Sequence, residues 1–191
     1  MSKNRLEAFS DGVIAIIITV MVLELKPPAS ADPGALRPLI PTFLSYVLSF
    51  VNLGIYWNNH HHLFQAIERV NGGVLWANLH LLFWLSLFPF GTAWMGENDF
   101  AVWPVALYGV DLALAAIAYF ILVRALMSLH GSDSTLADAL GNDFKGKISV
   151  VLYLVAIPLA FVNSWIACAI YVLVAALWLI PDPRIERKLA K

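Results

Sequence analysis

Long, nearly uninterrupted runs of apolar residues constrain the fold of this chain more than any other feature of its sequence. Residues 13–25 and 102–126 contain hardly any charged side chains, whereas a surface helix of a soluble protein has polar residues in every turn. An apolar helix of about 20 residues crosses the hydrocarbon core of a bilayer. Of the 191 residues, 60% are hydrophobic and 13% are charged, about half the charged fraction of soluble domains. The sequence predicts an all-α integral membrane protein.

The apolar runs and the helix breakers between them predict six transmembrane helices in a single domain, residues 1–191. The expected ranges are 5–25, 41–59, 74–95, 102–127, 148–162 and 165–180. Pro27-Pro28 follows the first range, Asn71-Gly72-Gly73 precedes the third, and Pro181-Asp182-Pro183 closes the last. The fifth and sixth helices are short, and a hairpin turn is expected between them at Asn163 and Ser164.

The first helix has features of a cleavable signal peptide, because Lys3 and Arg5 precede its apolar run. The acidic residues Glu7, Asp11 and Glu24 argue against this interpretation, since they surround the apolar segment where such signals carry none. We therefore expect the first helix to remain in the mature protein.

The basic residues indicate how the chain is oriented in the membrane. With both termini in the cytoplasm, Lys26 and Arg37 are the basic residues that fall outside, and ten of the 12 lie on the cytoplasmic side. Short cytoplasmic loops of membrane proteins carry such an excess of Lys and Arg. The sequence predicts a multi-pass protein of the cell membrane with cytoplasmic termini, and residues 131–147 are expected to form a cytoplasmic linker.

Several functional classes are not supported by the sequence. The formal net charge is −1, which suggests no polyanionic partner and excludes nucleic acid. Cys168 is the single cysteine, so the chain has no internal disulfide or thiolate metal site. The sequence contains no phosphate-binding loop, zinc signature, hydrolase elbow or carbonyl-type potassium filter. We therefore predict neither an enzyme nor a bound cofactor or metal ion.

Ionisable residues inside the predicted spans are candidates for function, because a charge in a bilayer is costly unless it is paired or hydrated. Asp11 and His80 lie at similar depths in the first and third helices, and Arg5 and residues 60–62 lie at the same end. We expect a polar network there, with pairing of Asp11 to Arg5 or a histidine, and contact with a permeating ion is the alternative. Its expected members are Arg5, Ser10, Asp11, His60 and His80. Asp111 finds no partner at its depth and is assigned no role.

Two other functions are compatible with these polar residues. A proton- or ion-coupled transporter would use Asp11 and His80 to bind and release protons, although no inverted repeat is evident. A redox enzyme would hold haem between His80 and one of the three histidines at 60–62. Those three are consecutive, so in a helix their side chains point about 100° apart and do not converge on one metal ion.

One face of the first helix is continuous. At 100° per residue, Gly12, Ile16, Thr19 and Leu23 fall within about 60° of one another, with Arg5 at the base of the same stripe. Such a stripe more often packs against another helix than lines a pore. Periodicity alone leaves both interpretations open.

The segment from Arg5 to Ile16, with the triplet Phe9-Ser10-Asp11, resembles the first-helix signature of the transmembrane protein 175 family. Residues 57–64 and 81–90 are also similar to that family. The first helix differs from it at one position, where Ile14 replaces the commoner phenylalanine. The resemblance implies a homotetrameric channel permeable to potassium and other monovalent cations, with lipid around it and the first helices around a central pore. The pore constrictions of the family fall here on Ile16, Thr19 and Leu23.

Overall fold

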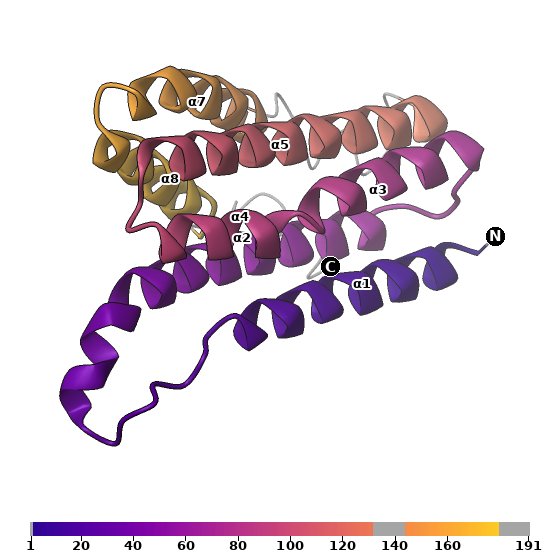
Figure 1. Cartoon of the computed structure of the whole chain (residues 1–191). Helices are drawn as coiled ribbons and strands as arrows, with labels where there is room; N and C mark the ends of the chain where they lie inside the picture. The colour runs from indigo at the N-terminus through magenta and orange to yellow at the C-terminus, as the bar shows by residue number, and fades with distance from the viewer. Residues whose placement is uncertain (1, 132–143, 180–191) are drawn as a thin grey trace.

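The structure, a computed structural model, describes residues 2–131 and 144–179, and all its regular elements are helices (Figure 1). The elements are α1 (Lys3–Leu23), the 3-10 helix η1 (Pro33–Leu39), α2 (Ile40–Gln65), α3 (Gly72–Leu85), α4 (Phe88–Glu97), α5 (Val102–His130), α7 (Phe144–Ala160) and α8 (Ser164–Leu179). The chain runs back and forth along one bundle, with α1 on one flank and α7 and α8 on the other. The predicted all-α class is confirmed.

Among the described residues, fewer helices have membrane length than the six predicted. By length and composition alone, four helical stretches of the described residues are able to cross a bilayer: residues 3–23, 33–65, 72–97 and 102–130. The α8 helix is apolar but has 16 residues, and α7 has 17. Several apolar helices of membrane length are therefore present, and the count of six crossings stays a prediction.

The second helix continues six residues beyond its predicted end at residue 59. The membrane span was predicted to end before the three histidines, whereas α2 extends through them to Gln65. Its C-terminal turns are buried in part, since His60 and Phe64 are both 0% exposed. Tertiary packing on α1 and α3 therefore offsets the weak helix propensity of this polar stretch.

The third predicted span, 74–95, is two helices in the structure. Pro89 lacks the N–H that would bond the carbonyl of Leu85, and its ring conflicts with that carbonyl. The helix therefore breaks at Ser86 and Leu87, where the Ser86 hydroxyl donates to the carbonyl of Phe83 at 2.7 Å. The segment restarts as α4 with Pro89 in its first turn, where a proline is tolerated.

The expected hairpin between the last two helices is present. The α7 helix ends at Ala160, and the Asn163 side chain accepts the backbone N–H of Trp165 at 2.9 Å, which caps α8. The α7 helix begins at Phe144, so the last residues of the predicted linker are helical. Residues 132–143 of that linker and the Pro181-Asp182-Pro183 terminator lie outside the described residues.

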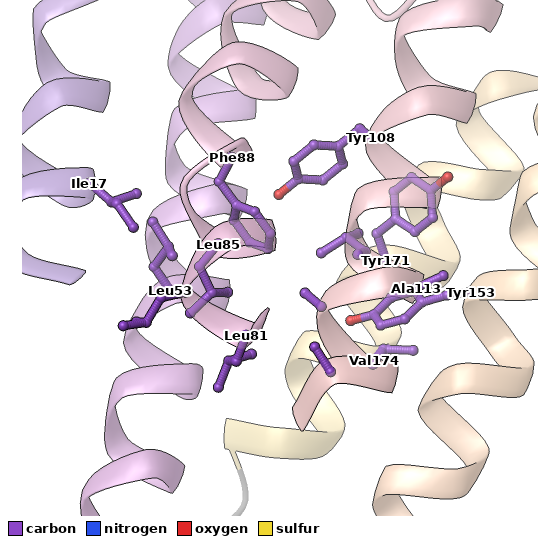
Figure 2. Packing of buried hydrophobic residues seen from close by; sticks show 14 of the residues in the cluster. Ile17, Leu53, Leu81, Leu85, Phe88, Tyr108, Ala113, Tyr153, Tyr171 and Val174 are labelled. Carbon is purple, nitrogen blue, oxygen red and sulfur yellow. The ribbon is translucent and has the colours of Figure 1, made fainter. Parts of the chain in front are cut away.

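The core between the helices is built around large aromatic side chains (Figure 2). Tyr108 of α5 packs against Phe88 of α4 and Tyr171 of α8, with ring centroids 5.9 and 6.0 Å apart. Tyr171 donates its hydroxyl to the carbonyl of Val105 at 3.0 Å. Its hydroxyl lies where a side chain on Gly109 would stand, so a glycine is required at that helix contact.

Side chains fasten the two ends of the bundle. At the end where α1 begins, Lys3 donates to the carbonyl of Ile67 at 3.0 Å, and Arg69 donates to the carbonyl of Leu129 at 3.2 Å. At the opposite end, the ring of Phe100 packs tilted against that of Trp165, with centroids 5.0 Å apart. The helices therefore alternate in direction between two defined ends.

We predict that Gly96→Ala destabilises the bundle by about 1–3 kcal/mol, the usual cost of overpacking. A Cβ at Gly96 would lie 2.6 Å from the backbone Cα of Thr42, so α4 and α2 would have to separate. Gly54→Ala is the matched control, because a Cβ there meets nothing within 4 Å, and it should be neutral or stabilising by about 1 kcal/mol. Thermal unfolding in detergent measures both, and equal melting temperatures would contradict the assigned contact.

Candidate functional site

The α1 helix has one buried face and one face that points away from the bundle. Leu6, Ile14, Ile17 and Met21 are the large apolar residues of the buried face, each at most 5% exposed. The predicted stripe lies opposite: Ile16 is 63% exposed and Leu23 74%, and Gly12, Thr19 and Arg5 are exposed as well. An apolar helix face of this size needs a cover of lipid or of another protein chain.

Thr19 presents an oxygen on the exposed face. Its hydroxyl proton is donated to the carbonyl of Ile16 at 2.9 Å within α1. A hydroxyl has one proton and two acceptor lone pairs. Since the proton is bonded within the helix, the oxygen of this exposed side chain remains available as an acceptor.

A buried hydrogen-bond chain fastens the other face of α1 to α3 and α2. The Asn78 amide donates to the Ser10 hydroxyl at 2.9 Å, and the Asn78 carbonyl oxygen lies 2.8 Å from Nε2 of His60. The Ser10 hydroxyl in turn donates to the carbonyl of Leu6 at 2.9 Å. Ser10, Asn78 and His60 are each 0% exposed, so one polar residue from each of three helices meets in the core.

The surroundings of His60 hold its ring in place. The imidazole stacks on Phe64 with centroids 4.3 Å apart. Its Nδ1 is buried and has no hydrogen-bond partner within the described part of the chain. Nε2 therefore makes the one polar contact of this ring there, and that contact is with Asn78.

Asp11 does not pair with Arg5 or with a histidine, as we had expected. Its carboxylate accepts the indole N–H of Trp57 at 3.0 Å. Arg5 lies on the exposed side of α1 and forms no ion pair with any described residue. The two side chains are six residues apart, which places them on different faces of the helix.

His80 also lies outside the expected network. It accepts the indole N–H of Trp84 at 2.9 Å, one turn further along α3. The matching depths of Asp11 and His80 suggested a contact, but depth does not fix the direction in which a side chain points. Asp11 and His80 are each bonded to a separate tryptophan.

A second contact between α1 and α2 was not predicted. Glu7 accepts from Nδ1 of His61 at 3.1 Å, and Gln65 lies 2.8 Å from Nε2 of the same ring. Glu7 and Asp11 are four residues apart, as are Trp57 and His61, so the pairs face each other as two rungs. In the sequence, the equal spacing of four residues in the two pairs was the signal for this contact.

Asn78 was missed for a different reason. It lies in the apolar stretch of α3 next to Ala77 and Leu79, two positions before the ionisable His80 that attracted attention. An amide in an apolar span commonly bonds to another helix. The isolated amide could therefore have indicated an interhelical contact, but not its partners.

The other polar residues in the described part of the chain form no metal-binding cluster. The three consecutive histidines diverge as expected: His60 meets Asn78, and His61 meets Glu7. No three His, Cys, Asp or Glu side chains of the described residues gather as a metal site. Asp111 is 7% exposed, and neither carboxylate oxygen has a hydrogen-bond partner in residues 2–131 and 144–179. The structure thus gives Asp111 no partner either.

We predict that Asn78→Leu destabilises the protein strongly, by about 1–3 kcal/mol for each buried group left without a partner. Leucine has the same branching as asparagine but no polar atoms, so the variant removes the bonds to Ser10 and His60. Trp57→Phe is the control, because it removes the exposed bond to Asp11 and should cost less. Thermal unfolding in detergent distinguishes the two, and a larger loss from Trp57→Phe would contradict the central role of Asn78.

Known proteins resemble this chain over nearly its whole length. The family described as "Endosomal/lysosomal potassium channel TMEM175" matches residues 5–89. A potassium channel of Chryseobacterium sp. (strain P1-3) is 54% identical over 189 residues, 99% of this chain and 98% of the relative. The human endosomal/lysosomal proton channel TMEM175 is 37% identical over 81 residues, 36% of this chain and 16% of the human protein.

The fold has a solved counterpart. The crystal structure of a lysosomal potassium-selective channel TMEM175 homolog from Chamaesiphon minutus matches with a TM-score of 0.81 and 29% identity, covering 93% of this chain and 96% of that one. These relatives are channels and not enzymes. The resemblance in the first helix is therefore confirmed, and the chain belongs to the TMEM175 family of ion channels.

Proposed function

We propose that the chain is one subunit of a homotetrameric, potassium-permeable cation channel in which four α1 helices surround the pore. The observation that carries the proposal is the outward face of α1, where Ile16 and Leu23 are 63% and 74% exposed. A second copy of the same face is a suitable cover, because related subunits around a symmetry axis present the same patch to it. Relatives named as potassium channels support the choice of ion.

The constriction in this proposal consists of Ile16, Thr19 and Leu23. Ile16 and Leu23 are seven residues apart, about 10 Å along the helix axis. Four copies of each make two apolar rings, and the Thr19 oxygens between them offer lone pairs to a partly hydrated ion. An apolar constriction removes water from an ion, and potassium releases water more readily than sodium. A modest preference for potassium follows without a carbonyl filter.

The polar contacts on the inner face of α1 hold this helix in position. Ser10 is completely buried and accepts a hydrogen bond from Asn78, and Asp11 accepts one from Trp57. These contacts favour an anchoring role for Asp11 over direct contact with a permeating ion. They also weaken the transporter hypothesis, because Asp11 and His80 share no hydrogen bond.

The proposed location is the cell membrane, with both termini in the cytoplasm. Lys3 and Arg69 lie at the end of the bundle where α1 begins. Lys26 lies at the other end, within 4.0 Å of Glu97, and Arg37 belongs to η1. The excess of basic residues at the first end supports its placement in the cytoplasm.

We predict that single cysteines placed in residues 29–36 and at Asn98 react with an impermeant thiol reagent added outside cells, whereas a cysteine at Gly131 does not. The background carries Cys168→Ala, which removes the one native thiol. The physical reason is the charge asymmetry between the two ends. Labelling from outside at Gly131 would contradict the proposed orientation.

We predict that Ile16→Asn and Leu23→Asn each raise conductance and reduce the potassium to sodium permeability ratio, because a polar ring no longer strips water from sodium. The measurement is the conductance and reversal potential of the purified protein in planar bilayers under potassium and sodium gradients. Unitary current steps in the unmodified protein would distinguish a channel from a carrier.

The matched control is Val22→Asn. Val22 is aliphatic, lies in the same helix, and is 45% exposed, but it points about 100° away from Leu23. Ile18 also lies off the stripe, but it packs against the core, so a polar residue there would also destabilise the fold. If Val22→Asn changes the permeability ratio while Ile16→Asn and Leu23→Asn do not, another face of α1 lines the pore.

A further inference from the structure

Three buried hydroxyl groups form a chain through the centre of the bundle. Thr92 of α4 and Ser49 of α2 have their hydroxyl oxygens 2.5 Å apart, and Ser49 and Tyr108 of α5 have theirs 2.8 Å apart. The Thr92 oxygen also lies 3.8 Å from the sulfur of Met21 in α1. All four residues are at most 3% exposed, and Figure 2 shows Tyr108 extending from α5 toward Phe88 of α4.

Thr92 is the donor at the centre of this chain. Its hydroxyl donates toward the Ser49 oxygen at 2.5 Å and toward the sulfur of Met21 at 3.8 Å. A hydroxyl has one proton, so Ser49 and Met21 are alternative acceptors of the same proton. Removal of the Thr92 hydroxyl therefore takes the donor from Met21 as well as from Ser49.

Met21 stands behind the proposed constriction. It follows Thr19 and precedes Leu23 by two positions each, so its side chain lies on the opposite face of α1 from theirs. The first half of α1 has polar bonds to other helices through Glu7, Ser10 and Asp11. In its second half, Met21 makes the only side-chain hydrogen bond to another helix within the described structure.

A sulfur is a weak acceptor, so this outer half of α1 is held less firmly than the inner half. Its remaining contacts are apolar, chiefly those of Ile14 and Ile17 with the core. Apolar contacts resist separation but allow a helix to slide or turn, whereas a hydrogen bond fixes a direction. The Thr92 hydroxyl is thus the group that can set the rotation of α1 at the level of Thr19 and Leu23.

We propose that Thr92, held by Ser49 and Tyr108 and bonded to Met21, is a positioning residue that sets how far the α1 constriction projects into the pore and hence its ion selectivity. The proposal rests on the proposed function, since it requires that Thr19 and Leu23 line the pore. In this proposal, α2, α4 and α5 influence permeation although they do not contact the ion.

The test uses two isosteric substitutions in the full-length protein. Thr92→Val removes the donor and keeps the shape, and Met21→Leu removes only the acceptor at the end of the chain. Both should change the potassium to sodium permeability ratio or the unitary conductance in planar bilayers by about twofold, the lower end of the range for one buried hydrogen bond, because sulfur is a weak acceptor. Thermal unfolding is measured on the same preparations.

Tyr171→Phe is the matched control. It removes the buried hydroxyl bond from α8 to the carbonyl of Val105 in α5, and it keeps the ring that packs on Tyr108. The main helix contacts of α1 are with α2, α3 and α4. Tyr171→Phe should lower thermal stability about as much as Thr92→Val does and leave permeation unchanged. If Met21→Leu and Thr92→Val destabilise the protein in the same way but conduct as the unmodified channel does, the inference is wrong.

Leu23→Asn in the same recordings separates this inference from the proposed function. If the hydroxyl chain acts through the constriction, Thr92→Val should have no further effect on the permeability ratio in a Leu23→Asn background. An effect of Leu23→Asn with none from Thr92→Val overturns the inference alone. No effect of Leu23→Asn overturns the constriction and the inference together.

Discussion

The hydrogen-bond chain from Ser10 through Asn78 to His60 is the contact on which the arrangement of this protein depends. It joins α1, α3 and α2 at one depth, where each of its members is fully buried. Helices in a bilayer gain little from apolar attraction to one another, because lipid tails are equally apolar. Polar bonds between them therefore specify which faces meet. With α1 oriented by Ser10, the stripe of Ile16, Thr19 and Leu23 can only point outward.

The two faces of α1 explain how one helix serves both the fold and the proposed pore. The inner face carries polar anchors in its first half and apolar residues with a single weak polar contact in its second half. The outer face has no partner within the described chain and is apolar where the constriction is proposed. A firm base and a softer outer end suit a constriction that closes by small movements of apolar rings.

The sequence predicted the fold in outline and the site in part. The apolar runs located the long helices to within a few residues at most ends, but the 3-10 helix η1 was not predicted. The end of α2 was also missed, because its last turns are stabilised by burial of His60 and Phe64. The sequence contains Pro89, but the long apolar stretch around it was interpreted as one helix. Of the expected network, Ser10 and His60 are joined through Asn78, which was not predicted, whereas Asp11 and His80 bind separate tryptophans.

The sequence by itself determined that the chain is a helical membrane protein and that it resembles one channel family, because hydropathy and a local signature are properties of contiguous residues. It also defined the stripe on α1, since helical geometry fixes which residues share a face. Only the tertiary structure decided that this stripe points away from the bundle, that Trp57 and Asn78 are the partners of Asp11 and Ser10, and that Thr92 meets Met21. Those facts depend on how helices distant in sequence are rotated against each other, and spacing along the chain carries no information about that rotation.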